Sequence, residues 1–322
     1  MRKSKAVVLA VLLLAAALPA AAQNVKITSL GSHDGEFCPL DRAMIFEDPD
    51  GTRILYDAGR TVRGPADPRL GKIDAVLISH FHGDHLGDTI QPAANAGACA
   101  KPDFSVAVTP NSNSVNIALG KQAPLVVGGE MHAFLAAKVK SLGGDPGKLV
   151  RLVRFGASTM FGKVFVATVP AVHSNGLASA FLNKEAAQLL DANGLTAYVG
   201  PPNGFVLRFS NGLTVYLSGD TGITAEQDLL VRGYYKANLA VMNIGGFPFT
   251  TGPVEATHVV NEMVKPNSVI ASHANEPATI DGKLVPTSKT AAFIKAAKMP
   301  VHVPLSGKTM EFDGNARCTS GC

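Results

Sequence analysis

The chain has 322 residues and a formal net charge of +4, from 29 lysines and arginines against 25 aspartates and glutamates. This small basic excess provides no extended cationic surface of the kind that binds nucleic acid, so a nucleic-acid partner is not expected. The length is sufficient for one large α/β domain or for two half-domains that share a core.

The first 22 residues have the organisation of a secretory signal peptide. Arg2, Lys3 and Lys5 precede an apolar run over 6–18, and the small residues Ala20 and Ala22 precede a cleavage site before Gln23. The run is too short for a convincing membrane span, and an uncleaved N-terminal anchor is the alternative. Cleavage leaves one domain, 23–322, with a net charge of +1 and no stable membrane anchor. We expect this mature protein in the periplasm or outside the cell.

Short apolar runs separated by turn residues fill the first part of the mature chain. They predict four strands, over 25–30, 43–47, 53–57 and 74–79. The polar loop 31–38 either overhangs a functional site or is a plain surface loop. Further along, a helix is expected over 130–142, followed by strands over 149–155 and 163–172.

The segment after the fourth strand, Ser79-His80-Phe81-His82-Gly83-Asp84-His85, places three imidazoles and a carboxylate within six positions. In an extended chain His80 and His82 point to the same side. Gly83 then permits a sharp turn that brings Asp84 and His85 toward the same volume. Imidazole nitrogens with carboxylate oxygens are the ligands of borderline and hard divalent metals. A solvated histidine-rich turn is the alternative, and the spacing and strand context argue against it.

These last two strands begin the second part, and a long excursion, 174–203, follows them; it is either a lid or pocket wall or a surface insertion. Asn183 is expected to cap a helix over 184–192 within it. Thr224 and Gln227 form a possible capping box for a helix through Arg232. The remaining expected elements are a hairpin of 205–209 and 213–217, strands over 238–244 and 268–272, helices over 253–264 and 287–298, and edge strands near Val301 and Thr309.

The sequence His80-x-His82-x-Asp84-His85 after a buried strand resembles the signature of the metallo-β-lactamase superfamily. Asp57 resembles the family's early strand-end aspartate, and the resemblance continues through His173, Asp220 and His273, each of which follows an apolar run in the family's order. It implies an α/β fold built as a four-layered αββα sandwich. It also implies two divalent metal ions, of which one is held by His80, His82 and His173, and the other by Asp84, His85 and His273, with Asp220 as the bridge. Zinc is expected for an exported hydrolase, and manganese, iron or nickel fit the same ligands.

The resemblance further implies a dinuclear metal-dependent hydrolase with a small-molecule substrate. A hydroxide between the metals would attack an ester, lactone or phosphodiester bond. Asp84 would orient this hydroxide and carry a proton to the leaving group, and Asp57 would support the metal loop by hydrogen bonding.

Several features bear on the branch of the superfamily. Asp220 at the bridging position argues against a true β-lactamase, and Asn243-Ile244-Gly245-Gly246 stands where ribonuclease Z has a histidine–glutamate motif. The segment 245–256 is more similar to the branch related to ascorbate lactonases, although His273 lacks that branch's Pro-x-His-Tyr context. Two other functions remain: a mononuclear iron oxygenase acting on thiol adducts through His80, His82, His173 and Asp220, and a non-catalytic metal-binding module.

The four cysteines, Cys38, Cys99, Cys318 and Cys322, suggest disulfides in an exported chain. Three connectivities are possible. The closeness of Cys318 and Cys322 favours a local bond, which would leave Cys38 to pair with Cys99. Cys38 as a thiolate ligand of the second metal is the alternative, but by the family resemblance Asp220 already fills the expected ligand position.

Overall fold

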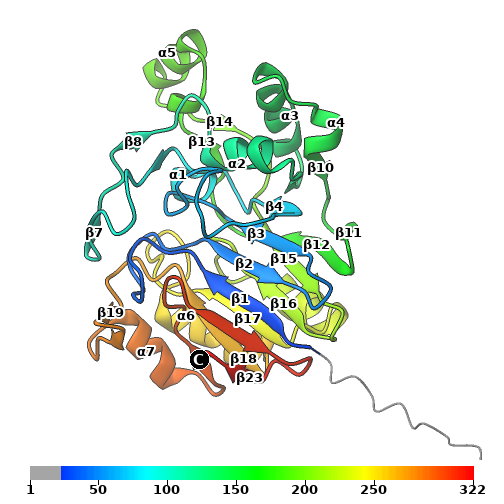
Figure 1. Ribbon diagram of the computed structural model, residues 1–322, viewed down its shortest axis with the longest axis vertical. Coiled ribbons are helices and arrows are strands. Elements are labelled where there is room, and N and C mark those ends of the chain that lie inside the picture. Colours follow the sequence, from blue (N-terminus) through cyan, green and yellow to red (C-terminus); the bar gives the residue numbers. More distant parts are fainter. Residues whose placement is uncertain (1–22) are drawn as a thin grey trace, which may run out of the picture.

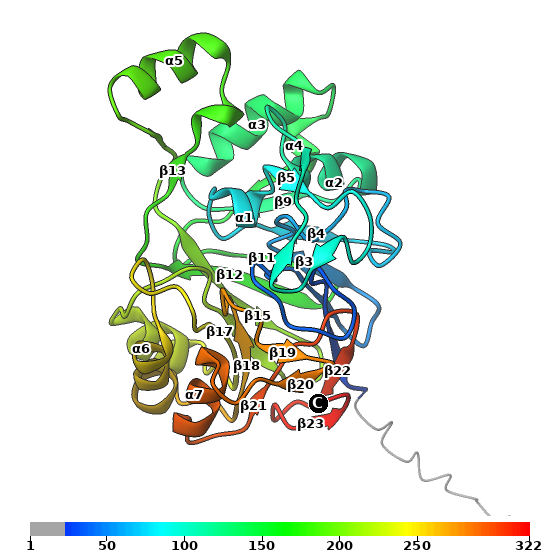
Figure 2. The same ribbon diagram turned by 90° about the vertical axis from the view of Figure 1, so that its left-hand side faces the viewer.

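Two β-sheets pack face to face and are covered by helices on their outer faces, as Figures 1 and 2 show. This is a computed structural model that describes residues 23–322, so the expected signal peptide lies outside the described residues. The expected αββα sandwich is confirmed.

The first sheet contains eight strands. In spatial order they are β10 (Val150–Leu152), β9 (Leu125–Val127), β4 (Ala75–Leu77), β3 (Arg53–Tyr56), β2 (Met44–Glu47), β1 (Val25–Ser29), β22 (Thr309–Phe312) and β23 (Cys318–Ser320). The helices α2 (Asn113–Lys121) and α3 (Met131–Ser141) cover its outer face, where Val115 and Leu135 are buried against Val76 and Leu125.

The second sheet contains seven strands. Their order is β11 (Ser158–Phe161), β12 (Val164–Pro170), β15 (Asn203–Arg208), β16 (Thr214–Leu217), β17 (Leu239–Asn243), β18 (Ser268–Ser272) and β21 (Val301–His302). Its outer face is covered by α6 (Pro253–His258), α7 (Lys289–Ala296) and two π-helical segments, η2 (Gln227–Tyr234) and η3 (Val259–Val264). Phe46, Phe205 and Val215 are fully buried between the sheets.

The remaining elements are short and lie in the connections. They are the helices α1 (Gly83–Leu86), α4 (Pro146–Leu149), α5 (Lys184–Ala192) and η1 (Ser179–Phe181), and the paired strands β5 (Thr89–Ile90) with β8 (Val106–Ala107), β6 (Gly97–Ala98) with β7 (Lys101–Pro102), β13 (Gly176–Leu177) with β14 (Ala197–Tyr198), and β19 (Thr279–Ile280) with β20 (Lys283–Leu284). None of the helices formed by the described residues is long and apolar enough to cross a membrane.

Most expected elements are present within one to three residues of their predicted bounds. Asn183 caps α5 as expected, with its side-chain oxygen accepting a hydrogen bond from the Ala186 amide. The capping box at Thr224 is only half formed, because its amide donates to Gln227 while its hydroxyl donates to Glu226. The strand near Thr309 was expected at an edge, and this was wrong, because β22 lies between β1 and β23.

Candidate metal centre

All seven predicted metal ligands meet at one end of the sandwich, because each follows a strand. The strands β12, β16 and β18 run in the same direction, so His173, Asp220 and His273 emerge at the same edge of the second sheet. The first sheet supplies the remaining four from the segment after β4 and from α1, which lies to the left of α2 in Figure 2. Ligand sites at the carboxyl ends of strands are the usual arrangement in α/β sheets.

The ligating atoms form overlapping groups. One contains His80, His82 and His173, and another contains Asp84, His85 and His273, with the atoms of each group within 4.8 Å of one another. Asp220 reaches both. Its Oδ2 lies 2.8 Å from His273 Nε2 and 3.9 Å from the Nε2 atoms of His80 and His173, and its Oδ1 lies 3.3 Å from His85 Nε2. The geometry therefore matches two triads joined by one carboxylate.

Two glycines let the chain approach closely at the ligands. Gly83 was expected to provide a sharp turn; instead it begins α1, and a Cβ there would lie 2.2 Å from Asp88 Oδ2. Arg60 holds that Asp88 carboxylate with two hydrogen bonds of 2.6 and 2.7 Å. Gly219, immediately before Asp220, has φ +59°, which residues with a side chain rarely adopt.

Asp57 supports the metal loop through hydrogen bonds, as expected, and is fully buried. Its Oδ1 accepts from the Ser79 amide at 2.8 Å, and its Oδ2 accepts from the Ser79 hydroxyl at 2.7 Å and from His85 Nδ1 at 2.8 Å. Because the Ser79 hydroxyl donates to Asp57, its oxygen accepts from His80 Nδ1, 3.0 Å away. Asp57 thus keeps a proton on Nδ1 of both His80 and His85 and leaves each Nε2 free as a ligand.

Among the buried atoms at the centre that have no hydrogen-bond partner within the described residues, three can face a metal ion: His80 Nε2, His85 Nε2 and Asp220 Oδ1. Leaving such atoms buried and unpaired is costly, and a metal ion would satisfy all three. Burial, followed by the charge on His85, holds the pKa of His80 well below its ordinary value, which favours the neutral ligand form. The donor set therefore fits divalent metal ions.

The carboxylates of the centre stay ionised, although burial by itself raises the pKa of a carboxyl group. Burial alone would raise the pKa of Asp220, but the charges of His273 and His85 hold it well below its ordinary value. For Asp84, His85 and Arg42 outweigh burial in the same way and hold its pKa low. Burial opposes the charge on His85, but Asp220, Asp84 and Asp57 raise its pKa to about 10. Without a metal the imidazolium of His85 thus balances these carboxylates, and a divalent cation would replace its proton.

Arg42 is a site residue that the sequence did not reveal. Its buried guanidinium donates from Nη2 and Nε to Asp84 Oδ2, at 2.9 and 3.2 Å, and from Nη2 to Asn275 Oδ1 at 2.7 Å. An isolated arginine at the end of a loop carries no spacing pattern, so only the three-dimensional contact identifies it. Arg42 holds the Asp84 carboxylate in place and favours its ionised form.

The structure contains both expected disulfides, Cys38–Cys99 and Cys318–Cys322. The first ties the loop preceding Arg42 to the segment around β6, so Cys38 is not a thiolate ligand. The 174–203 excursion is anchored next to the centre, where Asn175 Oδ1 accepts from the Phe81 amide at 2.8 Å. From this base it extends to α5, which buries none of its residues and lies at the top of Figure 1.

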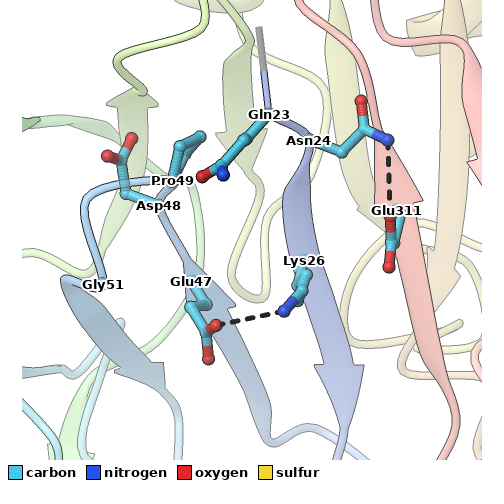
Figure 3. Close-up of a pocket in the computed structure, with 8 residues that line it drawn as sticks. All are labelled: Gln23, Asn24, Lys26, Glu47, Asp48, Pro49, Gly51 and Glu311. Atoms are coloured by element: carbon cyan, nitrogen blue, oxygen red, sulfur yellow. Dashed lines mark hydrogen bonds and ion pairs between the residues drawn. The ribbon is translucent and has the colours of Figure 1, made fainter. Parts of the chain in front are cut away.

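A surface hollow elsewhere on the molecule contains none of the predicted site residues. Figure 3 shows it beside β1 and β2, where Lys26 pairs with Glu47 at 3.6 Å and Asn24 donates to Glu311 at 3.3 Å. It has no histidine or cysteine in its lining. Among the described residues, one further group of possible ligands, His302 with Cys318 and Cys322, lies outside the centre, and its two cysteines are joined in a disulfide.

Residues 52–273 match the family described as the Beta-lactamase superfamily domain. A UPF0173 metal-dependent hydrolase from Cupriavidus necator is 30% identical over 82% of this chain and 81% of its own length, and one from Thermodesulfovibrio yellowstonii is 26% identical over 82% and 87%. Among solved structures, Igni18, a metallo hydrolase from the archaeon Ignicoccus hospitalis, aligns over 90% of this chain and 99% of its own, with a TM-score of 0.58 and 20% identity. The chain therefore belongs to the metallo-β-lactamase superfamily, as one of its metal-dependent hydrolases.

Proposed function

We propose that the protein is an exported hydrolase with two divalent metal ions, for which zinc is the first candidate, and that it cleaves an ester, lactone or phosphodiester bond in a small molecule. One observation carries the proposal: Asp220 directs its two carboxylate oxygens to histidines of both ligand triads. A bridging carboxylate reduces the repulsion between two adjacent cations. The export part rests on the sequence of residues 1–22 and is tested by N-terminal sequencing of the mature protein.

When bound, the ions would lower the pKa of water and polarise the scissile carbonyl or phosphoryl oxygen. The chain's own contribution is position and proton transfer. Asp84 Oδ2 lies 3.6 Å from His85 Nε2 and 3.8 Å from His273 Nε2, and Arg42 fixes its orientation. These contacts support a role for the Asp84 carboxylate in orienting the nucleophile and then in delivering a proton to the leaving group.

The first test combines metal analysis with an activity panel. Protein saturated with zinc should contain about two ions per chain and should hydrolyse at least one substrate among phosphodiesters, lactones, esters and β-lactams. One tightly bound iron, with oxygen consumed in the presence of a thiol substrate and no hydrolysis, would instead establish the oxygenase function.

The second test is Asp84→Asn, which keeps the side-chain volume but removes the anionic acceptor. Turnover should fall by about 10²–10⁴, the usual contribution of a positioned acid or base. The comparison is made at equal metal content, with Asp191→Asn on the exposed helix α5 as the control for loss of one negative charge. If Asp84→Asn with two metals bound turns over substrate as fast as the parent, Asp84 is only a metal ligand and has no acid–base role.

A further inference from the structure

Four large apolar side chains are exposed beside the metal ligands. Val172 precedes His173 and is 55% exposed, Ile223 follows Asp220 by three residues and is 45% exposed, and Phe247 and Phe249 are 71% and 81% exposed. We call these four residues the apolar rim. Soluble proteins rarely keep several large apolar side chains exposed together unless they contact something.

Hydrogen bonds join the three loops that carry the apolar rim. The Val172 amide donates to Thr221 Oγ1 at 3.0 Å, and the Gly222 amide donates to the Val172 carbonyl at 2.9 Å. The Thr251 amide donates to the Thr221 carbonyl at 3.3 Å. The three loops that carry the apolar rim are therefore joined to one another next to His173 and Asp220.

The same loops carry almost no charge. Residues 171–175, 218–224 and 244–252 contain no lysine or arginine, and Asp220 is their only acidic residue. Arg42, the guanidinium at the centre, is buried and already paired with Asp84. These loops supply no cation of their own to an anionic tail, and Lys289, which approaches them from α7, donates to the Gly245 carbonyl at 3.3 Å. An apolar tail would instead cover exposed side chains and gain the free energy of burial.

We infer that the apolar rim binds the hydrocarbon acyl chain of a neutral ester or lactone, while the bond to be cleaved lies at the metals. This inference rests on the proposed function for the identity of the bond, and it favours acyl substrates over phosphodiesters. In this inference the metal ligands recognise the reacting group of the substrate, and Phe247 and Phe249 select the length of its acyl chain.

The experiment measures binding separately from turnover. Zinc-loaded protein is titrated calorimetrically with acetohydroxamate, butyrohydroxamate and hexanohydroxamate, which share one metal-binding group and differ only in chain length. Burial of each methylene should tighten binding about two- to fourfold, hence about 16- to 250-fold between the first and last compounds. In Phe247→Ala/Phe249→Ala this gain should fall below about fivefold, while acetohydroxamate binds as it does to the parent.

Met160→Ala is the matched control, because Met160 is also exposed but lies on the edge strand β11, outside the apolar rim. It should retain the full gain. A parent protein without a gain, or a double variant that retains it, would overturn the inference. The inference would also be overturned if affinity did not rise with hydroxamate chain length and the double variant changed the mass of the protein in solution. The apolar rim would then be an interface between copies of the protein. If affinity rises with hydroxamate chain length but no ester or lactone is hydrolysed, the proposed function is wrong about the bond that is cleaved, and the assignment of the apolar rim as a binding surface is retained.

Discussion

Substituting Asp57→Asn tests whether one buried carboxylate controls the protonation of two metal ligands. The new side chain would keep the volume, and its amide oxygen could still accept from the Ser79 amide. Its amino group, however, would face the two atoms that donate to Asp57 Oδ2 in the parent, the Ser79 hydroxyl and His85 Nδ1. Both contacts can be kept only if they reverse direction. His85 then accepts at Nδ1 and carries its proton on Nε2, the atom needed by the metal.

The expected magnitudes follow from these contacts. Replacing two charge-assisted hydrogen bonds by neutral ones should lower the free energy of unfolding of the metal-free protein by about 2 kcal/mol. Loss of the correct tautomer should weaken zinc binding about 10- to 100-fold, or about 1.4–2.7 kcal/mol. Because the Ser79 hydroxyl would also become free to donate to His80, both triads should be affected.

Zinc affinity is measured by competition with a chromophoric chelator, and stability by denaturant unfolding in the presence of EDTA. Asp67→Asn is the control, since Asp67 is likewise buried and accepts hydrogen bonds from Arg69 and the Arg63 amide, away from the metal ligands. It should lower stability and leave zinc affinity unchanged. If Asp57→Asn binds zinc as tightly as the parent, the tautomer argument is refuted.

Three other predictions concern the bridge, a buried acid and the disulfides. Asp220→Ala should lower zinc occupancy at both triads, and a variant that retains two ions and full activity would show that Asp220 is not a bridge. Burial raises the pKa of Asp41 to about 6 from its ordinary value of 3.8, so the folded state binds this proton more tightly than the unfolded chain does. Its stabilisation is complete below pH 3.8 and is lost as the pH rises through about 6, and the difference in unfolding free energy between the parent and Asp41→Asn should change by about 3 kcal/mol across that range. Removing Cys38–Cys99, which closes a 61-residue separation, should cost about 4 kcal/mol of unfolding free energy, against about 2 for the four-residue Cys318–Cys322 separation; equal losses on denaturant unfolding would contradict this order.

The metal ligands were predictable because their chemistry coincides with a strong local pattern. His80, His173, Asp220 and His273 each follow a short apolar run, and the ends of such runs are easily located in a sequence. The partner of Asp84 was not predictable in this way. Arg42 is separated from Asp84 by 42 positions and belongs to a loop, where no periodicity indicates which side chain turns inward.

Local patterns also misjudged some backbone features. The helix α2 and the strand β9 were missed: α2 has only a weak apolar periodicity, with Asn113 and Ser114 among its buried residues. The sequence suggests that Gly83 allows a turn. In the structure a glycine is needed at this position because a Cβ would collide with the Asp88 carboxylate. A contact of this kind depends on Arg60, 23 positions earlier in the chain, and cannot be inferred from the glycine itself.

The place of β22 in the first sheet determines when that sheet can be completed. β1 is the first strand of the described residues, and one of its two neighbours is β22. Thr28 and Thr309, whose hydroxyl oxygens lie 2.7 Å apart, are 281 positions apart in the sequence. A growing chain that has not reached residue 309 holds β1 with an open edge, which can pair with strands of other molecules. Pairing of strands so far apart in the sequence is slow, and the first sheet is complete only after β22 has been synthesised and has paired with β1. The period in which β1 is exposed to aggregation therefore lasts at least until β22 has been made and has paired with it.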